Sequence, residues 1–216
     1  MLSFYIEQIV SKPIIYTVGH STHPIGYFLG LLKHYGVNCV VDVRSIPASR
    51  FNPQFNKKSL ASSLQANSID YLHFGEALGA RQTDPLLLDD EGRVDFEKIR
   101  STEKFEGAIS RIWKGAHDGY SIVLMCSEAE PLSCHRFVMI SQALKDFEVR
   151  HILKDKSILS QEVLETQLIK KFSNELSQTT FFGFNAGNAQ NLASAYKMMN
   201  KIVGYIPHEH KKSHPT

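Results

Sequence analysis

The sequence has few cysteines, almost no net charge and no long apolar segment. Its three cysteines cannot all pair with one another, which is typical of a reducing compartment rather than of a secreted disulfide scaffold. The first ten residues, MLSFYIEQIV, are too short and too polar to span a bilayer, and they lack the pattern of a signal peptide. We therefore expect a cytoplasmic protein with no membrane partner.

An excess of one charge is also missing. The 24 basic and 22 acidic residues leave a formal net charge of +2, so bulk charge does not predict nucleic-acid binding and any basic patch would have to be local. The sequence shows no internal repeat and no low-complexity segment. At 216 residues and 43% hydrophobic composition, the chain can form one α/β domain with a modest extension.

Short segments rich in β-branched and aromatic residues alternate with segments of helical periodicity. The predicted strands are residues 14–18, 37–43, 69–74, 121–126 and 148–153. The predicted helices of this part are residues 24–35, 57–66, 102–116, 136–145 and 161–172. Several strands are apolar at successive positions, as in strands that are covered on both faces. The pattern predicts an α/β fold with a mostly parallel sheet and helices on both faces.

The C-terminal part differs in composition. We expect residues 1–173 to form the α/β domain and residues 174–216 to form a helical extension that ends in a disordered tail, HEHKKSHPT. The extension contains a predicted helix at residues 192–203. It would pack on the domain or on a second subunit, so an oligomer could form through this helix.

Polar residues follow the ends of the predicted strands, where open parallel sheets bind ligands. The first strand leads into GHSTHP, in which Ser21 or Thr22 is a natural N-cap and Pro24 suits the first helical position. The third leads into GEALGARQTD, which carries Glu76 and Arg81. The second leads into DVRSIPASRFNPQF, with Asp42, Arg44, Ser45, Ser49 and Arg50.

The fourth strand leads into MCSEAEPLSCHR. Here we expect Ser133 to cap a helix whose first turn contains Cys134, His135 and Arg136. Cations beside a helix N-terminus face the positive end of its dipole, so something negative should offset them. Glu128, Glu130 or Asp42 could do so through internal ion pairs with Arg136 or Arg44. A bound anion such as phosphate is the alternative.

Three chemistries fit the cysteines and carboxylates. Thiol chemistry could use Cys126 or Cys134 with His20 as a base, although the loop of cysteine phosphatases and rhodanese-like enzymes is absent, because the sixth residue after Cys126 is Leu132. Acid–base chemistry could use Glu128 and Asp42, unless Asp42 is a structural partner of Arg44.

A metal is the third alternative. Cys126 and Cys134 are separated by seven residues, whereas structural zinc sites use close ligand pairs, and adjacent helical residues such as Cys134 and His135 point about a quarter-turn apart. We therefore expect no metal and no cofactor. Cys39, Trp113 and His151 are interpreted as core residues.

Taken in order, GHS, DVRSIPASRFNPQF, YLHFGEALGA and LMCSEAEPLSCHR followed by HIL resemble the family catalogued as domain of unknown function 488. The resemblance runs from about Ile14 to Ile152 and extends toward Phe172. It implies an α/β fold with these loops on one edge, and it implies no reaction. The matching residues are Gly19, His20, Ser21, Asp42, Arg44, Pro47, Ser49, Gly79, Cys126, Glu128, Pro131, Cys134, His135 and Arg136.

The leading hypothesis is an enzyme that acts on a phosphate-bearing substrate, such as a nucleotide or a nucleic-acid end. The catalytic candidates are Cys126, Glu128, His20 and Asp42. The candidates for holding the anion are Gly19, Ser21, Arg44, Ser49, Arg50, Cys134, His135 and Arg136. On this hypothesis, Arg44→Ala would abolish binding with little change in melting temperature. The rival hypotheses are a noncatalytic nucleic-acid or nucleotide binding module, aided by the C-terminal lysines, and a thiol or metal redox protein.

Overall fold

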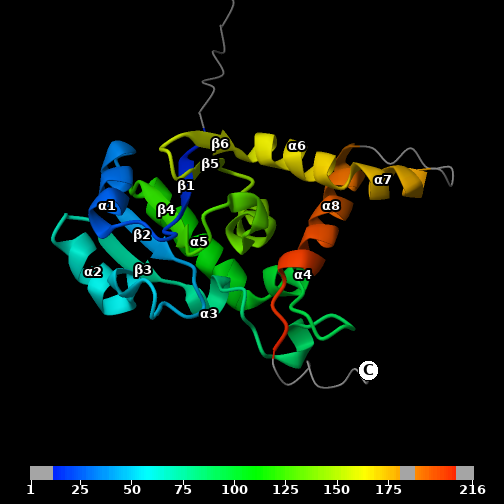
Figure 1. Cartoon of the computed structure of the whole chain (residues 1–216), viewed down its shortest axis with the longest axis horizontal. Coiled ribbons are helices and arrows are strands. Elements are labelled where there is room, and N and C mark those ends of the chain that lie inside the picture. The colour runs from blue at the N-terminus through cyan, green and yellow to red at the C-terminus, as the bar shows by residue number, and fades with distance from the viewer. Residues whose placement is uncertain (1–11, 181–187, 208–216) are drawn as a thin grey trace, which may run out of the picture.

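The five predicted strands form one parallel sheet in the computed structural model, which describes residues 12–180 and 188–207. They are β1 (Ile14–Gly19), β2 (Cys39–Asp42), β3 (Asp70–His73), β4 (Ile122–Cys126) and β5 (Glu148–Ile152). A sixth strand, β6 (Ile158–Ser160), pairs antiparallel with β5, and its three residues are too few for a clear sequence pattern. The spatial order is β3-β2-β4-β1-β5-β6 (Figure 1).

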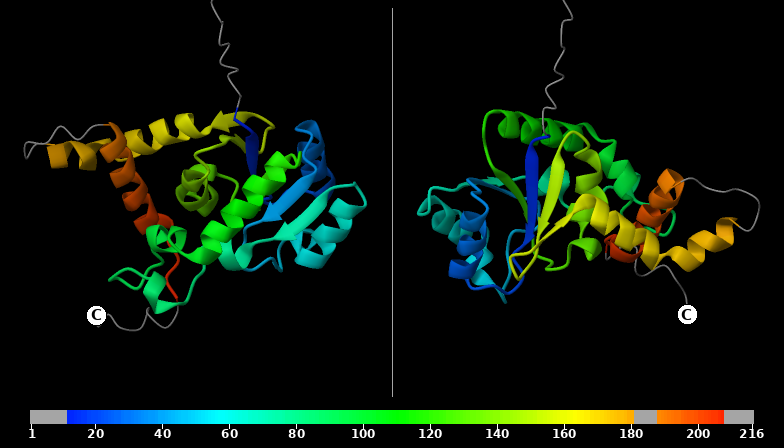
Figure 2. Two further views of the ribbon diagram at one scale, coloured as in Figure 1. Left: turned by 180° about the vertical axis from the view of Figure 1, so that it is seen from behind. Right: turned by 90° about the horizontal axis from the view of Figure 1, so that it is seen from above.

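Alternate side chains of the strands enter two separate cores, one on each face of the sheet. On one face, Val18, Val40 and Met125 pack with residues of α1 (Ile25–His34) and α2 (Lys57–Gln65). On the other, Val41 and Leu124 pack with residues of α5 (Glu103–His117) and α6 (Gln161–Lys171). Figure 2 shows the helices on both sides of the sheet. The structure confirms the predicted α/β fold and explains why the strands are apolar at successive positions.

One predicted helix is wrong in kind. Residues 136–145 form the π-helix η4 (Arg136–Ile140) followed by a 3₁₀ turn, η5 (Ser141–Ala143). The Ser141 amide donates to the Arg136 carbonyl five residues earlier, which is the π-helical bond, and the Ser141 hydroxyl donates to the same carbonyl at 2.7 Å. Short elements were also not predicted: α3 (Gly75–Leu78), α4 (Phe96–Arg100), α7 (Ser173–Thr180) and the 3₁₀ turns Pro53–Phe55, Pro85–Leu87 and Pro131–Ser133.

The C-terminal helix, α8 (Asn188–Val203), packs on the α/β domain of the same chain and begins four residues earlier than predicted. Ala195, Tyr196 and Met199 are buried in the core that α5 and α6 share. Asn200 fixes the helix further, because its side chain accepts from the Phe96 amide at 2.7 Å and donates to the Val94 carbonyl at 2.8 Å. Figure 1 shows α8 running from α7 back to α4. The predicted disorder of residues 208–216 lies outside the described residues, as do residues 1–11 and 181–187. Within the described ranges, no helix has the length and apolar character that crossing a membrane would require.

A buried polar chain joins the sheet to α6 and α8. His151 on β5 is fully buried, as predicted, with Nδ1 2.8 Å from the Thr17 hydroxyl and Nε2 3.0 Å from Oε1 of Gln161. Gln161 in turn donates to the Tyr196 hydroxyl at 2.8 Å. Cys39 is buried as predicted, but the core assignment is wrong for Trp113, whose side chain is 45% exposed and stacks on His117 along the solvent side of α5.

His151 should make stability depend on pH. Burial lowers its pKa from 6.5 to about 4, opposed by the bond with Gln161; the charge of Arg136 lowers the pKa further and that of Glu162 raises it. The unfolded chain therefore binds a proton between pH 6.5 and 4 that the native state does not bind. The free energy of unfolding therefore decreases as the pH is lowered from 6.5 to 4, and this one group contributes a slope that approaches about 1.4 kcal/mol per pH unit. Urea denaturation at several pH values should show a shallower slope for His151→Asn than for the wild type, and equal slopes would contradict the assignment.

Candidate functional site

The polar residues meet at a change of direction in the sheet. β1 and β4 are neighbours, but the chain leaves β1 toward α1 on one face and leaves β4 toward η4 on the other. In open α/β sheets, such a point opens a crevice at the carboxyl ends of the strands, where ligands bind. A pocket of about 570 Å³ lies there, a volume within the usual range for small-molecule sites. Its polar lining comes from His20, Ser21, Thr22, Arg44, Ser45, Ser49, Asn52, Arg81, Cys126, Ser127, Glu128, Ser133, Cys134, His135 and Tyr205.

The turn after β1 brings two strand ends together through backbone contacts. The His20 and Ser21 amides donate to the Cys126 and Ser127 carbonyls, at 2.9 and 3.0 Å. Ser21 adopts a left-handed conformation, with φ of 48°, and neither it nor Thr22 caps α1, which begins at Ile25 directly after Pro24. The predicted N-cap is therefore wrong. Because Ser21 is used to turn the chain, its side chain lies at the pocket instead.

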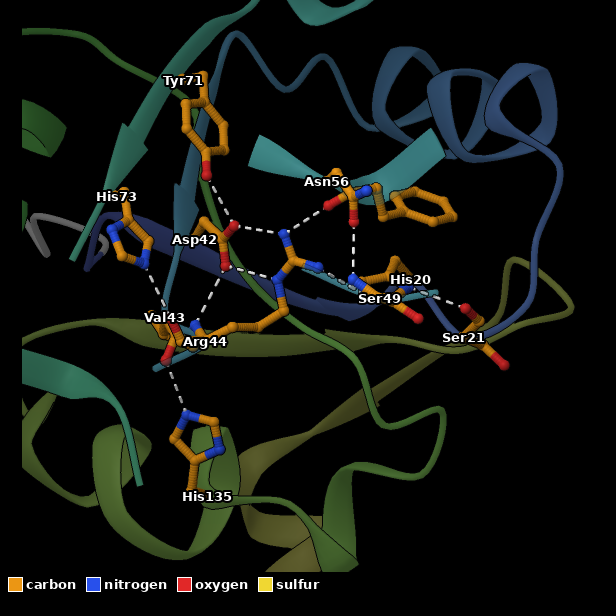
Figure 3. Close-up of polar contacts among 11 residues, drawn as sticks. His20, Ser21, Asp42, Val43, Arg44, Ser49, Asn56, Tyr71, His73 and His135 are labelled. Carbon is orange, nitrogen blue, oxygen red and sulfur yellow. Dashed lines mark hydrogen bonds and ion pairs between the residues drawn. The ribbon is translucent and has the colours of Figure 1, made fainter. Parts of the chain in front are cut away.

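Asp42 and Arg44 form a buried ion pair (Figure 3). Asp42 accepts from Nε of Arg44 at 2.9 Å, from its second terminal nitrogen at 2.6 Å and from the Tyr71 hydroxyl at 2.8 Å. Arg44 also donates to the Phe55 carbonyl at 2.8 Å. Burial alone would lower the pKa of Arg44, but the bond and charge of Asp42 raise it. The structure thus contains the internal ion pair that was one alternative for Asp42 and Arg44. The first terminal nitrogen of Arg44 makes no bond to Asp42 or Phe55.

That nitrogen meets His20. The distance from the first terminal nitrogen of Arg44 to Nε2 of His20 is 3.0 Å, while Nδ1 of His20 lies 2.8 Å from the Ser21 carbonyl and the ring stacks on Phe55. Since a carbonyl can only accept, Nδ1 carries the proton and Nε2 accepts from Arg44. Burial lowers the pKa of His20 to about 4, against the opposing bond to Ser21, so the ring is neutral at pH 7.

Four side chains from the β4 end form the floor of the site, and we call them the thiol cluster: Cys126, Glu128, Cys134 and His135. One potential donor atom from each lies within 4.8 Å of all the others. Nδ1 of His135 lies 3.6 Å from Sγ of Cys126 and 3.8 Å from Sγ of Cys134. Oε2 of Glu128 lies 2.6 Å from Sγ of Cys126 and 3.5 Å from Sγ of Cys134.

The cluster corrects a prediction about neighbouring side chains. Ser133 ends the 3₁₀ turn Pro131–Ser133 and caps no helix. Cys134 is extended, with φ of −127° and ψ of 143°, and the helical turn begins only at His135. The quarter-turn separation expected of adjacent helical residues therefore does not apply, and Cys134 and His135 point toward the same space.

Electrostatic coupling within the cluster separates the two thiols. Burial raises the pKa of Cys126 well above its ordinary value, and its bond with Cys134 raises it further. Burial also acts to raise the pKa of Cys134, but the bond from Cys126 and the charge of Arg136 bring it below the ordinary value. Burial opposes the charged forms of Glu128 and His135, yet contact with Cys126 lowers the pKa of Glu128 to about 2 and raises that of His135. The cluster therefore favours negative charge on Glu128.

Some predicted binding residues shape the pocket without lining it. Arg136 is fully buried and donates to the Glu128 and Ala129 carbonyls at 2.5 and 2.9 Å. Gly19 ends β1 behind that loop, and Arg50 is exposed outside the pocket. Ser49 does line the pocket, and its hydroxyl oxygen accepts from the Phe51 and Asn52 amides.

Other residues at the pocket were not selected from the sequence. Arg81 lines it and lies 5.6 Å from the centre of the Tyr205 ring, whereas Glu76 from the same loop pairs with Lys104 elsewhere. Gly75 and Gly79, which precede Arg81 in GEALGARQTD, could have indicated a loop at the site. Val203 and Tyr205, at the end of α8, complete the wall, and no local pattern places them there.

The family comparison covers the centre of this arrangement. A family model described as Domain of unknown function DUF488 matches residues 24–143, which is more than half of the chain. The chain belongs to the DUF488 family. No curated protein and no solved structure matches it. The DUF488 match contains Asp42, Arg44 and the whole thiol cluster. It excludes β1 with His20 and it excludes α8, so the matched span is narrower than the resemblance at residues 14–152.

Proposed function

We propose that the pocket is the active site of an enzyme that acts on a small phosphate-bearing substrate. The observation that carries the proposal is that an accessible guanidinium, Arg81, lines the same pocket as the buried thiol cluster. Binding groups and reactive groups thus line one pocket, whose size suits a nucleotide or a smaller phosphate ester.

Arg81 is the cation best placed to meet a phosphate group. Its side chain is exposed, it rests near the Tyr205 ring, and none of the ion pairs among the described residues includes it. Its amide donates to the Ser45 hydroxyl oxygen at 2.9 Å, which fixes the loop that carries it. Arg–phosphate contacts are strong and often bidentate. Arg44 adds positive charge nearby, although Asp42 holds most of its donors.

Glu128 is the proposed proton acceptor. Its carboxylate lies at the pocket, with Cys126 and Cys134 beside it, and the loop that carries it is held by Arg136. A water molecule or a substrate hydroxyl would give its proton to Glu128 and attack phosphorus, while the bond from phosphorus to the leaving oxygen breaks and that oxygen takes up a proton. Neutral His20, held by Arg44, would keep the guanidinium in place beside the reacting group.

Replacing Arg81 by alanine should weaken binding of inorganic phosphate and adenosine monophosphate by about 10- to 100-fold, because a charged hydrogen bond contributes about 1.5–3 kcal/mol. Calorimetric titration measures this directly. The matched control is Arg50→Ala, an exposed arginine of the neighbouring loop that does not line the pocket, and it should change affinity less than twofold. Equal losses in both variants, or unchanged binding in Arg81→Ala, would contradict the proposal.

The nucleic-acid module has weaker support in the described residues. Of the C-terminal lysines that could extend a basic surface, Lys197 pairs with Glu97 at 3.2 Å. If the module reading holds instead, binding of a single-stranded oligonucleotide should depend steeply on salt and should survive loss of Glu128.

A further inference from the structure

We propose that the thiol cluster is a binding site for one divalent ion of the zinc class. Two sulfurs, one imidazole nitrogen and one carboxylate oxygen converge from the two ends of a ten-residue loop, 126–135. This is the donor set that zinc takes in proteins. The inference stands without the proposed function, because it concerns what the cluster binds and not which substrate enters the pocket. Glu128 would bind the ion through Oε2, which faces the sulfurs, and this leaves Oε1 for the proposed proton transfer.

The spacing of the donor atoms fits a tetrahedral ion. Bonds of about 2.3 Å to sulfur and about 2.0–2.2 Å to nitrogen or oxygen place tetrahedral ligands about 3.5–3.8 Å from one another. The distance from Cys126 to His135 is 3.6 Å, that from Cys134 to His135 is 3.8 Å, and that from Cys134 to Glu128 is 3.5 Å. The 2.6 Å between Cys126 and Glu128 is too short and must open by about 1 Å, and the remaining two pairs of donor atoms lie within 4.8 Å of each other.

His135 is already in the form that a metal requires. Its Nε2 lies 3.1 Å from the Val43 carbonyl, and because a carbonyl only accepts, this nitrogen carries the proton. In the neutral ring that a metal binds, Nδ1 then carries the lone pair, 3.6 and 3.8 Å from the two sulfurs. Figure 3 shows this contact between His135 and Val43. Metal-bound histidines almost always donate their other ring N–H to such an outer partner, which fixes the tautomer and the ring orientation.

Charge and burial support the same assignment. Two thiolates, one carboxylate and a divalent ion carry one net negative charge, and Arg136, fully buried beside His135, has no carboxylate partner among the described ion pairs. Buried charges normally need a partner of opposite sign. All four residues line the pocket, but Cys126, Cys134 and His135 are buried while Glu128 is exposed, so the carboxylate is the ligand most open to solvent.

Metal analysis of the full chain, purified anaerobically with a reductant and then dialysed with zinc, tests the site. We expect one zinc per chain, and after exchange with cobalt a sulfur-to-cobalt charge-transfer absorption. Cys126→Ser and Cys134→Ser should bring both signals near zero. Cys39→Ala is the matched control, because Cys39 is buried in the same core but outside the cluster, and it should retain both. Glu128→Gln should keep one ion per chain with weaker affinity.

The wild type decides the matter even where a thiol variant does not fold. Zinc should raise its melting temperature progressively, whereas magnesium, which prefers oxygen ligands, should not. The inference is overturned if the wild-type protein takes up no zinc. It is also overturned if the folded Cys126→Ser and Cys134→Ser variants bind zinc as tightly as the wild type does. Phosphate binding lost in Arg81→Ala with zinc retained separates this site from the proposed function.

Discussion

Arg44→Ala is expected to lower the free energy of unfolding by about 3–5 kcal/mol, because it leaves the carboxylate of Asp42 buried without its cation. Asp42 is fully buried and Arg44 is 5% exposed, and the pair shares two side-chain hydrogen bonds. Removal of the guanidinium also frees the Phe55 carbonyl and the His20 ring from their donor. Equilibrium urea denaturation measures the loss. This reverses the expectation of an unchanged melting temperature.

The chain contains a matched control for this experiment. Arg150 also pairs with a carboxylate two residues earlier, Glu148, at 2.7 Å, but the two side chains are 34% and 46% exposed. Arg150→Ala should therefore cost at most about 1 kcal/mol, as exposed ion pairs do. Similar losses in both variants would show that burial does not set the strength of the Asp42–Arg44 pair, which would contradict the structural role given to Arg44.

Gly19→Ala is expected to destabilise the fold by about 3 kcal/mol or more, at or above the upper end of what inserting one methyl group usually costs. A Cβ at Gly19 would lie 1.8 Å from the Glu128 carbonyl oxygen and 3.0 Å from a terminal nitrogen of Arg136. The first contact is with backbone, so the loop 127–130 must move. Glu128 would then leave its place beside Cys126. The variant should lose stability in urea denaturation, and zinc binding should weaken with it.

Gly30→Ala is the control for Gly19→Ala. Gly30 lies within α1, is exposed, and a Cβ there would have no neighbour within 4 Å. The same chemical change should stabilise the chain by about 0.5–1 kcal/mol, because alanine favours a helix interior. If Gly19→Ala proves as harmless as Gly30→Ala, the close approach of the two strand-end loops is wrong.

The fold was predictable where a local pattern reflects burial. β1, β2 and β4 show as apolar runs because each is covered on both faces, whereas the edge strand β3 is half exposed; α1 and α5 show as amphipathic stretches. The π-helix at Arg136–Ile140 was not predictable, because the apolar pattern does not show that the Ser141 amide bonds to the carbonyl five residues earlier instead of four. The packing of α8 depends on contacts across about a hundred residues, such as that of Asn200 with Phe96.

The site was predictable in place more than in detail. Parallel strands put their carboxyl ends on one edge, so His20, Arg44 and Cys126 were expected near one another, and all three line the pocket. Other contacts at the site could not be predicted from the sequence. Arg136 binds backbone carbonyls, and Tyr205 lines the pocket from a segment after α8, far along the chain. One step of the argument against a metal was wrong: the extended backbone of Cys134 places its sulfur 3.8 Å from Nδ1 of His135, not a quarter-turn away.

X-ray absorption at the zinc edge of the zinc-loaded wild-type chain tests the central claim most directly, namely that the loop after β4 folds its cysteines, histidine and glutamate around one point. Two sulfur neighbours at about 2.3 Å and two nitrogen or oxygen neighbours at about 2.0–2.2 Å are the predicted result. A shell of nitrogen and oxygen alone would contradict it.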